Sequence, residues 1–286
     1  MDQRAGTYLV IMKKYIAFFF LGMASVFLIA VVSIMARLPS SEKIKGCLIT
    51  RMYKVELCPG SKNYISLNKI SKHLKKSVVL TEDSSFYDHH GFDWSAIEKN
   101  AREGWKNGKF RRGGSTITQQ LAKNMFLTKD RTFIRKALEA IITYRIENTL
   151  SKDEILERYL NVVEFGKDVF GVKAAAKYYF QKNAAELTVV ESAFLTLVLP
   201  NPVKYSSSFY QKELTPFARK RLNTIVNNMY RYHRISATEY EQAVYEASYF
   251  FRPEPSFDDF LRLEEVSREN DNNPPSFEDE EEDLRL

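Results

Sequence analysis

The chain has 286 residues, of which 44% are hydrophobic, and this composition suits one globular domain with appendages. Its net charge of +6 is unevenly spread, because residues 254–286 hold 13 acids and 3 arginines and leave residues 1–253 at +16. A basic body indicates an anionic partner such as phospholipid, a diphosphate or nucleic acid. The sequence has no zinc-finger spacing and no aromatic RNA-binding signature, so nucleic acid is not expected as a partner.

Residues 15–36 form a run of 22 residues without a charge. In a helix, with a rise of about 1.5 Å per residue, this run is long enough to cross the hydrocarbon core of a membrane. No clear signal-peptidase site follows it, so we expect an uncleaved transmembrane helix between a short segment at 1–14 and a linker at 37–66. The basic residues on its two sides are balanced and do not orient it.

The linker holds the two cysteines of the chain, Cys47 and Cys58. They could form a disulfide in an oxidising compartment or remain two free thiols, and the sequence leaves both readings open. Weak alternation of apolar and polar residues favours a short strand over 50–57.

An acid-rich segment follows an amphipathic helix expected over 66–80. It places Glu82, Asp83 and His89 close in sequence to the bulky rings of Phe86 and Phe92. An apolar wall raises the pKa of a carboxyl group and makes it a usable proton acceptor or donor near neutral pH. The plainer reading is a helix C-terminus followed by a loop of solvated charges.

A second helix is expected over 92–105, followed by a flexible loop that ends at Gly113 and Gly114. Ser115 and Thr116 can cap the next helix, whose N-terminal amides could then face an anion. That helix carries a polar stripe that suits sugar and phosphate contacts, with an ordinary solvated face as the alternative. The stripe consists of Gln119, Gln120, Lys123 and Asn124.

Glu139 lies at the edge of an apolar stripe in a helix expected over 136–150, where it could be partly buried. Ser151 and Glu154 have the spacing of a capping box that starts the following helix. Further helices are expected over 171–180, 187–199, 215–234 and 236–249, the last capped by Ser236. Residues 253–286 are acidic and poorly apolar, so we expect them to be disordered.

Four motifs in this order resemble those of the peptidoglycan glycosyltransferase family, which polymerises the lipid-linked precursor lipid II. They are E-D-x-x-F-x-x-H-x-G at 82–91, G-G-S-T-I-T-Q-Q at 113–120, R-K-x-x-E at 135–139 and S-K-x-x-I-L-E-x-Y-L-N at 151–161. The family has alanine at the position of Gly114. The resemblance covers about 75–205.

The resemblance implies a mostly α-helical, lysozyme-like glycosyltransferase domain with two lobes over 67–252, behind one N-terminal transmembrane helix. It implies a bacterial inner-membrane protein with a cytoplasmic N-terminus and a periplasmic catalytic domain. The expected partners are lipid II, the growing lipid-linked glycan, membrane phospholipid and other cell-wall synthesis proteins.

The resemblance also implies roles for single residues. Glu82 matches the catalytic base and Glu139 the second acid, while Lys123, Arg131 and Arg135 are candidates for the diphosphate. The residues expected to bind substrate are Asp83, Phe86, His89, Gly113, Ser115, Thr116, Gln119, Gln120, Lys123, Asn124, Arg131, Arg135 and Lys136. No metal cluster and no required cofactor are indicated, although a divalent cation such as Mg²⁺ or Mn²⁺ could help neutralise the diphosphate.

Two other functions remain open at this point. A lytic enzyme that cleaves finished peptidoglycan would also use an acid at a helix end, but it would need no lipid diphosphate. A non-catalytic scaffold for cell-wall assembly would fit the acidic tail, but it would not need both acids and Lys123.

Overall fold

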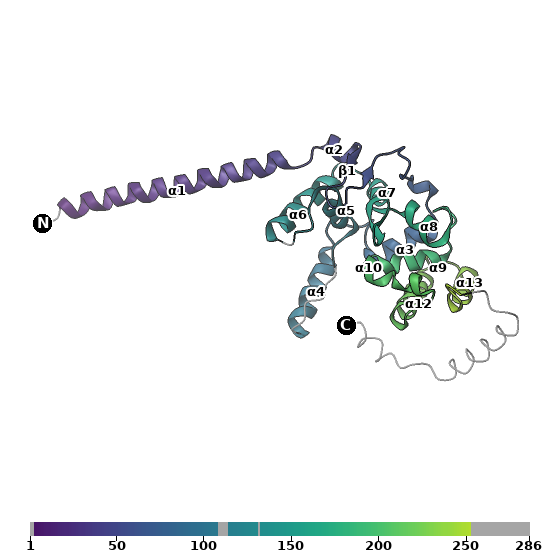
Figure 1. The fold of residues 1–286 in the computed structure, drawn as a ribbon. Coiled ribbons are helices and arrows are strands. Elements are labelled where there is room, and N and C mark those ends of the chain that lie inside the picture. Colours follow the sequence, from purple (N-terminus) through teal and green to yellow (C-terminus); the bar gives the residue numbers. More distant parts are fainter. Residues whose placement is uncertain (1–2, 108–113, 131, 253–286) are drawn as a thin grey trace, which may run out of the picture. The chain divides into compact units, whose positions relative to one another are not determined.

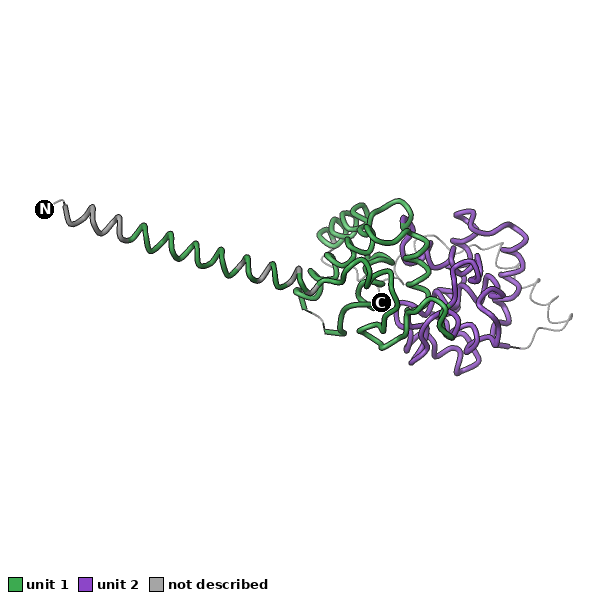
Figure 2. Tube along the Cα trace, turned by 90° about the horizontal axis from the view of Figure 1, so that it is seen from above, with its two compact units in different colours: residues 1–64, 86–162 green, residues 65–85, 163–286 purple. Residues whose placement is uncertain are grey.

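The structure is a computed structural model that describes residues 3–107, 114–130 and 132–252. Over these ranges helices dominate, and the strands form two short hairpins (Figure 1). The predicted mostly helical class is therefore confirmed. The chain divides into two compact units, and each is built from two separate stretches of sequence (Figure 2). The first unit comprises residues 1–64 and 86–162, and the second comprises residues 65–85 and 163–286.

The first unit begins with the 35-residue helix α1 (Gln3–Arg37). Within the described residues, no helix combines the length and the apolar character that a membrane crossing requires. The transmembrane anchor over 15–36 therefore stays a prediction. The remaining elements of this unit are α2 (Ser41–Lys45), β1 (Leu48–Ile49), β2 (Glu56–Leu57), α4 (Trp94–Asn107), α5 (Ile117–Phe126), α6 (Phe133–Glu147) and α7 (Lys152–Val162).

Helix α5 forms the core of the first unit, because it packs against both α6 and α7. Its apolar face buries Leu121 and Met125, and α7 contributes Ile155 and Tyr159. Burying a large apolar side chain stabilises the fold by roughly 1.5–3 kcal/mol, so this apolar contact fixes the direction of α5. The opposite, more polar side of α5 is then left to face the pocket described below.

The strand predicted over 50–57 is present only at its end, as β2, which pairs with β1 in a short hairpin. Leu48 pairs with Leu57, and a disulfide joins Cys47 to Cys58 just outside this pair, with the two Cα atoms 4.3 Å apart. Residues between the strands form a loop, because the buried Thr50 accepts the Val55 N–H with its hydroxyl at 2.9 Å. This local hydrogen bond competes with strand pairing.

The second unit is organised around α9 (Val189–Val198), whose ten residues are all buried. Helices α3 (Lys72–Glu82), α12 (Pro216–Arg231) and α13 (Ala237–Ser248) pack against α9. The smaller elements are η1 (Leu67–Lys69), β3 (Glu164–Gly166), β4 (Val169–Phe170), α8 (Val172–Phe180), α10 (Pro202–Tyr205) and α11 (Ser207–Gln211).

The helix predicted over 66–80 is in fact two elements, η1 and α3, separated at Ile70 and Ser71. Ser71 caps α3 by accepting the His73 N–H, and its own hydroxyl donates to the Leu187 carbonyl at 2.8 Å. The second contact comes from a residue far along the chain, which the local apolar pattern does not reveal. Helix α3 ends at Glu82, two residues beyond the predicted end.

Helix starts agree closely with the predicted caps. Thr116, Ser151 and Ser236 each accept the backbone N–H of the residue three positions on. Helix α6 begins earlier than predicted, because Thr132 caps it by accepting the Arg135 N–H at 3.1 Å. The tail predicted to be disordered, 253–286, lies outside the described residues.

Candidate functional site

Glu82 and Asp83 lie at the C-terminal end of α3 in the second unit. Glu82 is the last helical residue and is half-buried. Asp83 is the C-cap, is buried, and donates its N–H to the Val79 carbonyl at 3.0 Å. The sequence therefore places the predicted base at a helix end.

Phe86 begins the segment of the first unit that leads to α4, and its side chain is fully buried. Lys152 lies over this ring with its Nζ 4.6 Å from the ring centroid. The half-buried His89 accepts the Gly91 N–H at its Nδ1 at 3.1 Å. These contacts correct the prediction that Phe86 binds substrate, because a fully buried ring anchors the segment instead. His89 is thereby bonded to the backbone of its own loop.

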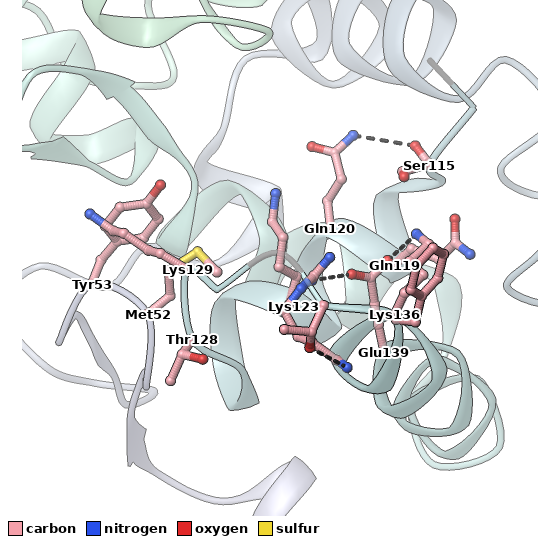
Figure 3. Close-up of a pocket in the computed structure, with 13 residues that line it drawn as sticks. Met52, Tyr53, Ser115, Gln119, Gln120, Lys123, Thr128, Lys129, Lys136 and Glu139 are labelled. Atoms are coloured by element: carbon pink, nitrogen blue, oxygen red, sulfur yellow. Dashed lines mark hydrogen bonds and ion pairs between the residues drawn. The ribbon is translucent and has the colours of Figure 1, made fainter. Parts of the chain in front are cut away.

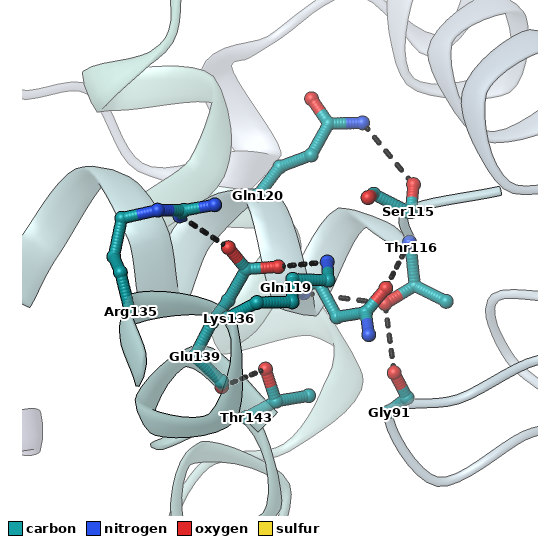
Figure 4. A network of polar contacts seen from close by, with 9 residues as sticks. All are labelled: Gly91, Ser115, Thr116, Gln119, Gln120, Arg135, Lys136, Glu139 and Thr143. Atoms are coloured by element: carbon teal, nitrogen blue, oxygen red, sulfur yellow. Dashed lines mark hydrogen bonds and ion pairs between the residues drawn. The ribbon is translucent and has the colours of Figure 1, made fainter. Parts of the chain in front are cut away.

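Gly91 connects this segment to α5, because its carbonyl accepts the Thr116 hydroxyl at 2.8 Å (Figure 4). Thr116 and Gln119 form a reciprocal capping box, in which the Gln119 side chain accepts the Thr116 N–H at 3.0 Å. The Gln119 N–H in turn donates to the Thr116 hydroxyl. The prediction that the first-turn amides face an anion is therefore wrong for Thr116 and Gln119, which satisfy one another.

The polar stripe of α5 divides into two sets. Gln119 and Asn124 are buried, so the alternative of an ordinary solvated face does not hold for them. Gln120 and Lys123 are half-buried and face a pocket. The Gln120 side chain is fixed at both ends, since it accepts the Tyr159 hydroxyl at 3.1 Å and donates to the Ser115 carbonyl at 3.4 Å.

Glu139 on α6 is only 3% exposed and has two cationic neighbours on its own helix (Figure 4). Arg135 donates to one carboxylate oxygen at 2.7 Å, and Lys136 donates to the other. Spacings of three and four residues place these side chains on one helix face. The expectation that Glu139 is at least partly buried is confirmed, and the ion pairs explain how a buried carboxylate is accommodated.

A pocket of about 670 Å³ lies over this face of α5 and α6 (Figure 3). Four cationic side chains and one carboxylate contribute to its lining, so it favours an anionic ligand. Its lining residues are Met52, Tyr53, Ser115, Gln119, Gln120, Lys123, Thr128, Lys129, Thr132, Phe133, Arg135, Lys136 and Glu139.

Seven of the sequence-predicted site residues meet in this pocket. They are Ser115, Gln119, Gln120, Lys123, Arg135, Lys136 and Glu139. Phe86, His89, Thr116 and Asn124 belong to the same unit but do not line the pocket. Glu82 and Asp83 belong to the second unit. Gly113 and Arg131 lie outside the described residues.

A wall of the pocket that was not predicted from the sequence is formed by Met52, Tyr53, Thr128 and Lys129. Lys129 could have been suspected from the basic stretch around it, whereas the hairpin residues carry no local signal. Glu147 was not predicted either. Its carboxylate accepts the Thr118 hydroxyl at 2.5 Å and the Lys152 ammonium at 2.9 Å. Glu147 ties α5, α6 and α7 together behind the pocket.

Comparison with known proteins places this geometry in a family. Residues 50–230 match the family described as Transglycosylase. The chain belongs to the transglycosylase family. The predicted family and the class of enzyme that it implies are confirmed.

Relatives of this transglycosylase chain carry the name biosynthetic peptidoglycan transglycosylase. The one from Janthinobacterium sp. (strain Marseille) is 44% identical over 164 residues, which cover 56% of this chain and 71% of the relative. The one from Methylobacillus flagellatus is 48% identical over 142 residues, and the one from Azoarcus sp. (strain BH72) is 49% identical over 146 residues. These two matches cover 62% and 63% of the relatives' own length, which is less than two thirds.

Proposed function

We propose that this transglycosylase polymerises lipid II into β-1,4 glycan strands for cell-wall synthesis. The observation that carries the proposal is the cationic pocket around the buried Glu139. Lipid II presents a diphosphate, and a pocket with several Lys and Arg side chains can hold such a group and stabilise it as it departs. Relatives that share nearly half of the aligned residues are named for the biosynthetic reaction.

The reaction is a single displacement with inversion. Glu82 accepts the proton of the incoming 4-hydroxyl, whose oxygen bonds to the anomeric carbon of the donor. The bond between that carbon and the phosphate oxygen breaks, and undecaprenyl diphosphate leaves with the electron pair. Lys123 and Arg135 are proposed to receive the negative charge on the departing diphosphate.

Glu139 organises the cations of the pocket in this proposal. Its carboxylate fixes Arg135 and Lys136 on one helix face, so their positions are set before substrate arrives. A divalent cation, Mg²⁺ or Mn²⁺, could join the diphosphate there. The described residues contain no group of three or more His, Cys, Asp or Glu side chains that could hold a metal ion by themselves.

We further propose that the chain is a single-pass protein of the bacterial inner membrane, with its N-terminus cytoplasmic and its catalytic domain periplasmic. The uncharged run at 15–36 supports this, because it forms part of a continuous helix whose described side chains are exposed. The Cys47–Cys58 disulfide suits an oxidising compartment. Alkaline extraction of membranes tests the anchor, since an integral protein stays in the pellet and a peripheral one is released.

Two exposed apolar stripes support phospholipid as a partner. On α4, Trp94 is 71% and Trp105 is 86% exposed; on α6, Phe133 is 97% exposed. Ile97 lies three residues after Trp94 on α4 and is also exposed. On α6, Ile134, Ile141 and Tyr144 are exposed at successive spacings of seven and three residues, which place them along one helix face. Exposed apolar stripes beside basic residues suit the headgroup layer of a bilayer.

A gel of labelled lipid II incubated with the purified full chain tests the function. We expect a ladder of glycan products from the wild type, and a rate lower by roughly 10²–10⁴-fold for Glu82→Gln. Glu241→Gln, which removes an exposed acid of α13, is the matched control and should give the wild-type ladder. Full activity of Glu82→Gln would overturn the role of Glu82.

The same assay separates the other candidate functions. A protein that produces no ladder but cleaves finished peptidoglycan would be a lytic enzyme. A folded wild-type protein with neither activity would be left with the scaffold function. Both outcomes contradict the proposal.

A further inference from the structure

One wall of the cationic pocket comes from a part of the chain to which the proposed function assigns no role. Figure 3 shows Met52, Tyr53 and Lys129 on one side of the pocket and Glu139 and Lys136 on the other. Met52 and Tyr53 belong to the loop of the hairpin β1–β2. This hairpin lies more than 70 residues before Glu139 in the sequence, yet both contribute to one cavity.

The hairpin loop has a defined shape. The buried Thr50 donates its N–H to the Val55 carbonyl at 2.8 Å and accepts the Lys54 N–H at its own carbonyl at 3.1 Å. Lys54 has a positive φ of 59°, which lets the chain reverse within this short loop. Tyr53 therefore projects from a turn whose backbone hydrogen bonds are satisfied locally.

The same loop also fixes the end of α5. Arg51 donates its N–H to the Met125 carbonyl at 2.9 Å, and Met52 donates to the Asn124 carbonyl at 3.4 Å. The last carbonyls of a helix have no partner within the helix, so the hairpin supplies a cap from elsewhere in the chain. Helix α5 carries Gln120 and Lys123 into the pocket, and its C-terminal end is held by the loop that carries Tyr53.

Tyr53 holds a cation at the pocket wall. The Nζ of Lys129 lies 4.5 Å from the centroid of the Tyr53 ring. Arg135 and Lys136, by contrast, are paired with a carboxylate that offsets their charge. A neutral ring orients an ammonium group without cancelling its charge, and it leaves N–H donors for an anion.

The Cys47–Cys58 disulfide closes this hairpin immediately outside the Leu48–Leu57 pair. Each strand has only two residues, and a two-stranded hairpin of this size is marginally stable in water. The covalent link restricts the open conformations available to the loop. The position of Tyr53 therefore depends on the disulfide as well as on the contacts with α5.

We propose that the disulfide-closed hairpin is a ligand-binding wall of the pocket, in which Tyr53 positions Lys129 as a further cation for the substrate diphosphate. The inference rests on the proposed function for the identity of the ligand. Tyr53 is a positioning residue, because it acts through Lys129. Reduction of the disulfide lets the hairpin loop adopt open conformations, and this weakens binding of the diphosphate.

Binding of inorganic pyrophosphate to the full chain, measured by calorimetry in metal-free buffer, tests the wall directly. We expect Lys129→Ala and Tyr53→Ala each to raise Kd by about five- to tenfold, because each removes or releases one charged contact. Tyr53→Phe keeps the ring face and should stay within about twofold of the wild type. Lys43→Ala removes an exposed lysine of α2 outside the pocket and is the matched charge control.

Steady-state polymerisation of lipid II gives a second readout. Loss of a contact made equally in the ground and transition states raises KM with little change in kcat. We expect this pattern for Tyr53→Ala and Lys129→Ala, with rescue in Tyr53→Phe. A loss of kcat with unchanged KM in both alanine variants would overturn the positioning role.

The disulfide is tested by reduction. The reduced wild type and the double variant Cys47→Ser/Cys58→Ser should show the same raised Kd for pyrophosphate. The reductant should have no further effect on the double variant, which has no cysteine left. Wild-type affinity after complete reduction, verified by titration of two thiols, would overturn the role of the disulfide.

The outcomes separate this inference from the proposed function. Polymerisation with unchanged KM in both Tyr53→Ala and Lys129→Ala would overturn the inference and leave the function intact. Pyrophosphate binding that responds to these variants in a protein without polymerase activity would overturn the function and leave the binding wall intact. If the wild type polymerises lipid II but does not bind pyrophosphate, the KM values alone decide.

Discussion

Arg135 and Glu139 lie one helical turn apart on α6, and the Arg135 guanidinium donates to the buried Glu139 carboxylate at 2.7 Å. Arg102 and Glu98 are also four residues apart and 2.7 Å from each other on α4, in the opposite order along the helix, but these two side chains are 69% and 71% exposed. The chain thus contains a buried and an exposed Arg–Glu ion pair of the same spacing.

Removing the arginine should have different effects at the two positions. We expect Arg135→Ala to lower the free energy of unfolding by about 1–3 kcal/mol, because the buried carboxylate loses one of its two cations. Arg102→Ala should cost less than about 0.5 kcal/mol, since water screens an exposed pair. Urea unfolding at pH 7 measures both, and equal costs would contradict the burial of Glu139.

Gly91 and Gly60 form a second matched pair, because both have a φ of +85°. A Cβ at Gly91 would lie 2.8 Å from Thr143 Cγ2 and 3.0 Å from Glu147 Cγ, whereas a Cβ at Gly60 meets nothing within 4 Å. We expect Gly60→Ala to cost about 1–2 kcal/mol from backbone strain alone. Gly91→Ala should cost at least about 1 kcal/mol more, because the side chains of Thr143 and Glu147 must shift.

Thermal and urea unfolding of the two glycine variants measure this difference. Gly91→Ala should also reduce polymerisation, because the Gly91 carbonyl holds the Thr116 cap of α5. Gly60→Ala should leave the activity close to the wild type. If the Gly91→Ala protein were as stable as the Gly60→Ala protein, the predicted steric cost at Gly91 would be contradicted.

Glu239 makes the stability of the folded protein depend on pH. The Lys72 ammonium and the Ser236 backbone N–H lower the pKa of Glu239 to about 2, from an ordinary value of about 4.5. A pKa that is lower in the folded state adds stability above the unfolded-state pKa, and this stability is lost as the pH falls toward the folded-state pKa. We therefore expect Glu239→Gln to destabilise the protein at pH 7 and to have a smaller effect near pH 3.

Glutamine retains the hydrogen bond to Ser236, so this substitution isolates the charge. The cost at pH 7 should stay below about 1 kcal/mol, because the ion pair with Lys72 is partly exposed. Urea unfolding at pH 7 and pH 3 measures it, with Glu241→Gln as an exposed control on the same helix. A cost that grows on acidification would contradict the pKa shift.

The two tryptophans of the chain, Trp94 and Trp105, both lie on α4 and are exposed. Tryptophan fluorescence therefore reports on α4 alone. If α4 enters the headgroup layer as proposed, brominated phospholipid should quench the emission of the full chain in vesicles, and the emission should shift to shorter wavelength than in detergent-free water. Single Trp→Phe variants assign the signal, and quenching equal to that with unbrominated lipid would contradict membrane contact.

Features that depend on residues three or four positions apart could be predicted from the sequence. The Thr116 cap and the capping boxes at Ser151 and Ser236 belong to this class, as does the burial of Glu139 at the edge of an apolar stripe. In each case the interacting groups meet through the helical repeat, so the local sequence contains the information.

Features that depend on distant partners could not be predicted. Phe86 is buried beneath Lys152, and Met52 and Tyr53 reach a pocket whose other residues begin at Ser115. Neither relationship has a local signature, because tertiary packing selects the partners. The capping role of Gln119 was missed for another reason: its polar neighbours favoured a ligand-binding interpretation over a bond to its own helix end.

The long-range hydrogen bonds of α3 have a consequence for synthesis of the chain. Ser77 on α3 is hydrogen-bonded to Thr196 on α9 at 2.8 Å, across 119 residues of sequence. At roughly 5–20 residues per second, a ribosome needs on the order of 6–24 s to make that stretch. During this interval the apolar face of α3 has no α9 to cover it, although residues 86–162 of the first unit have already been made. The helix that carries Glu82 therefore waits longer for its packing partner than the helices of the first unit, which pack against elements close to them in the sequence.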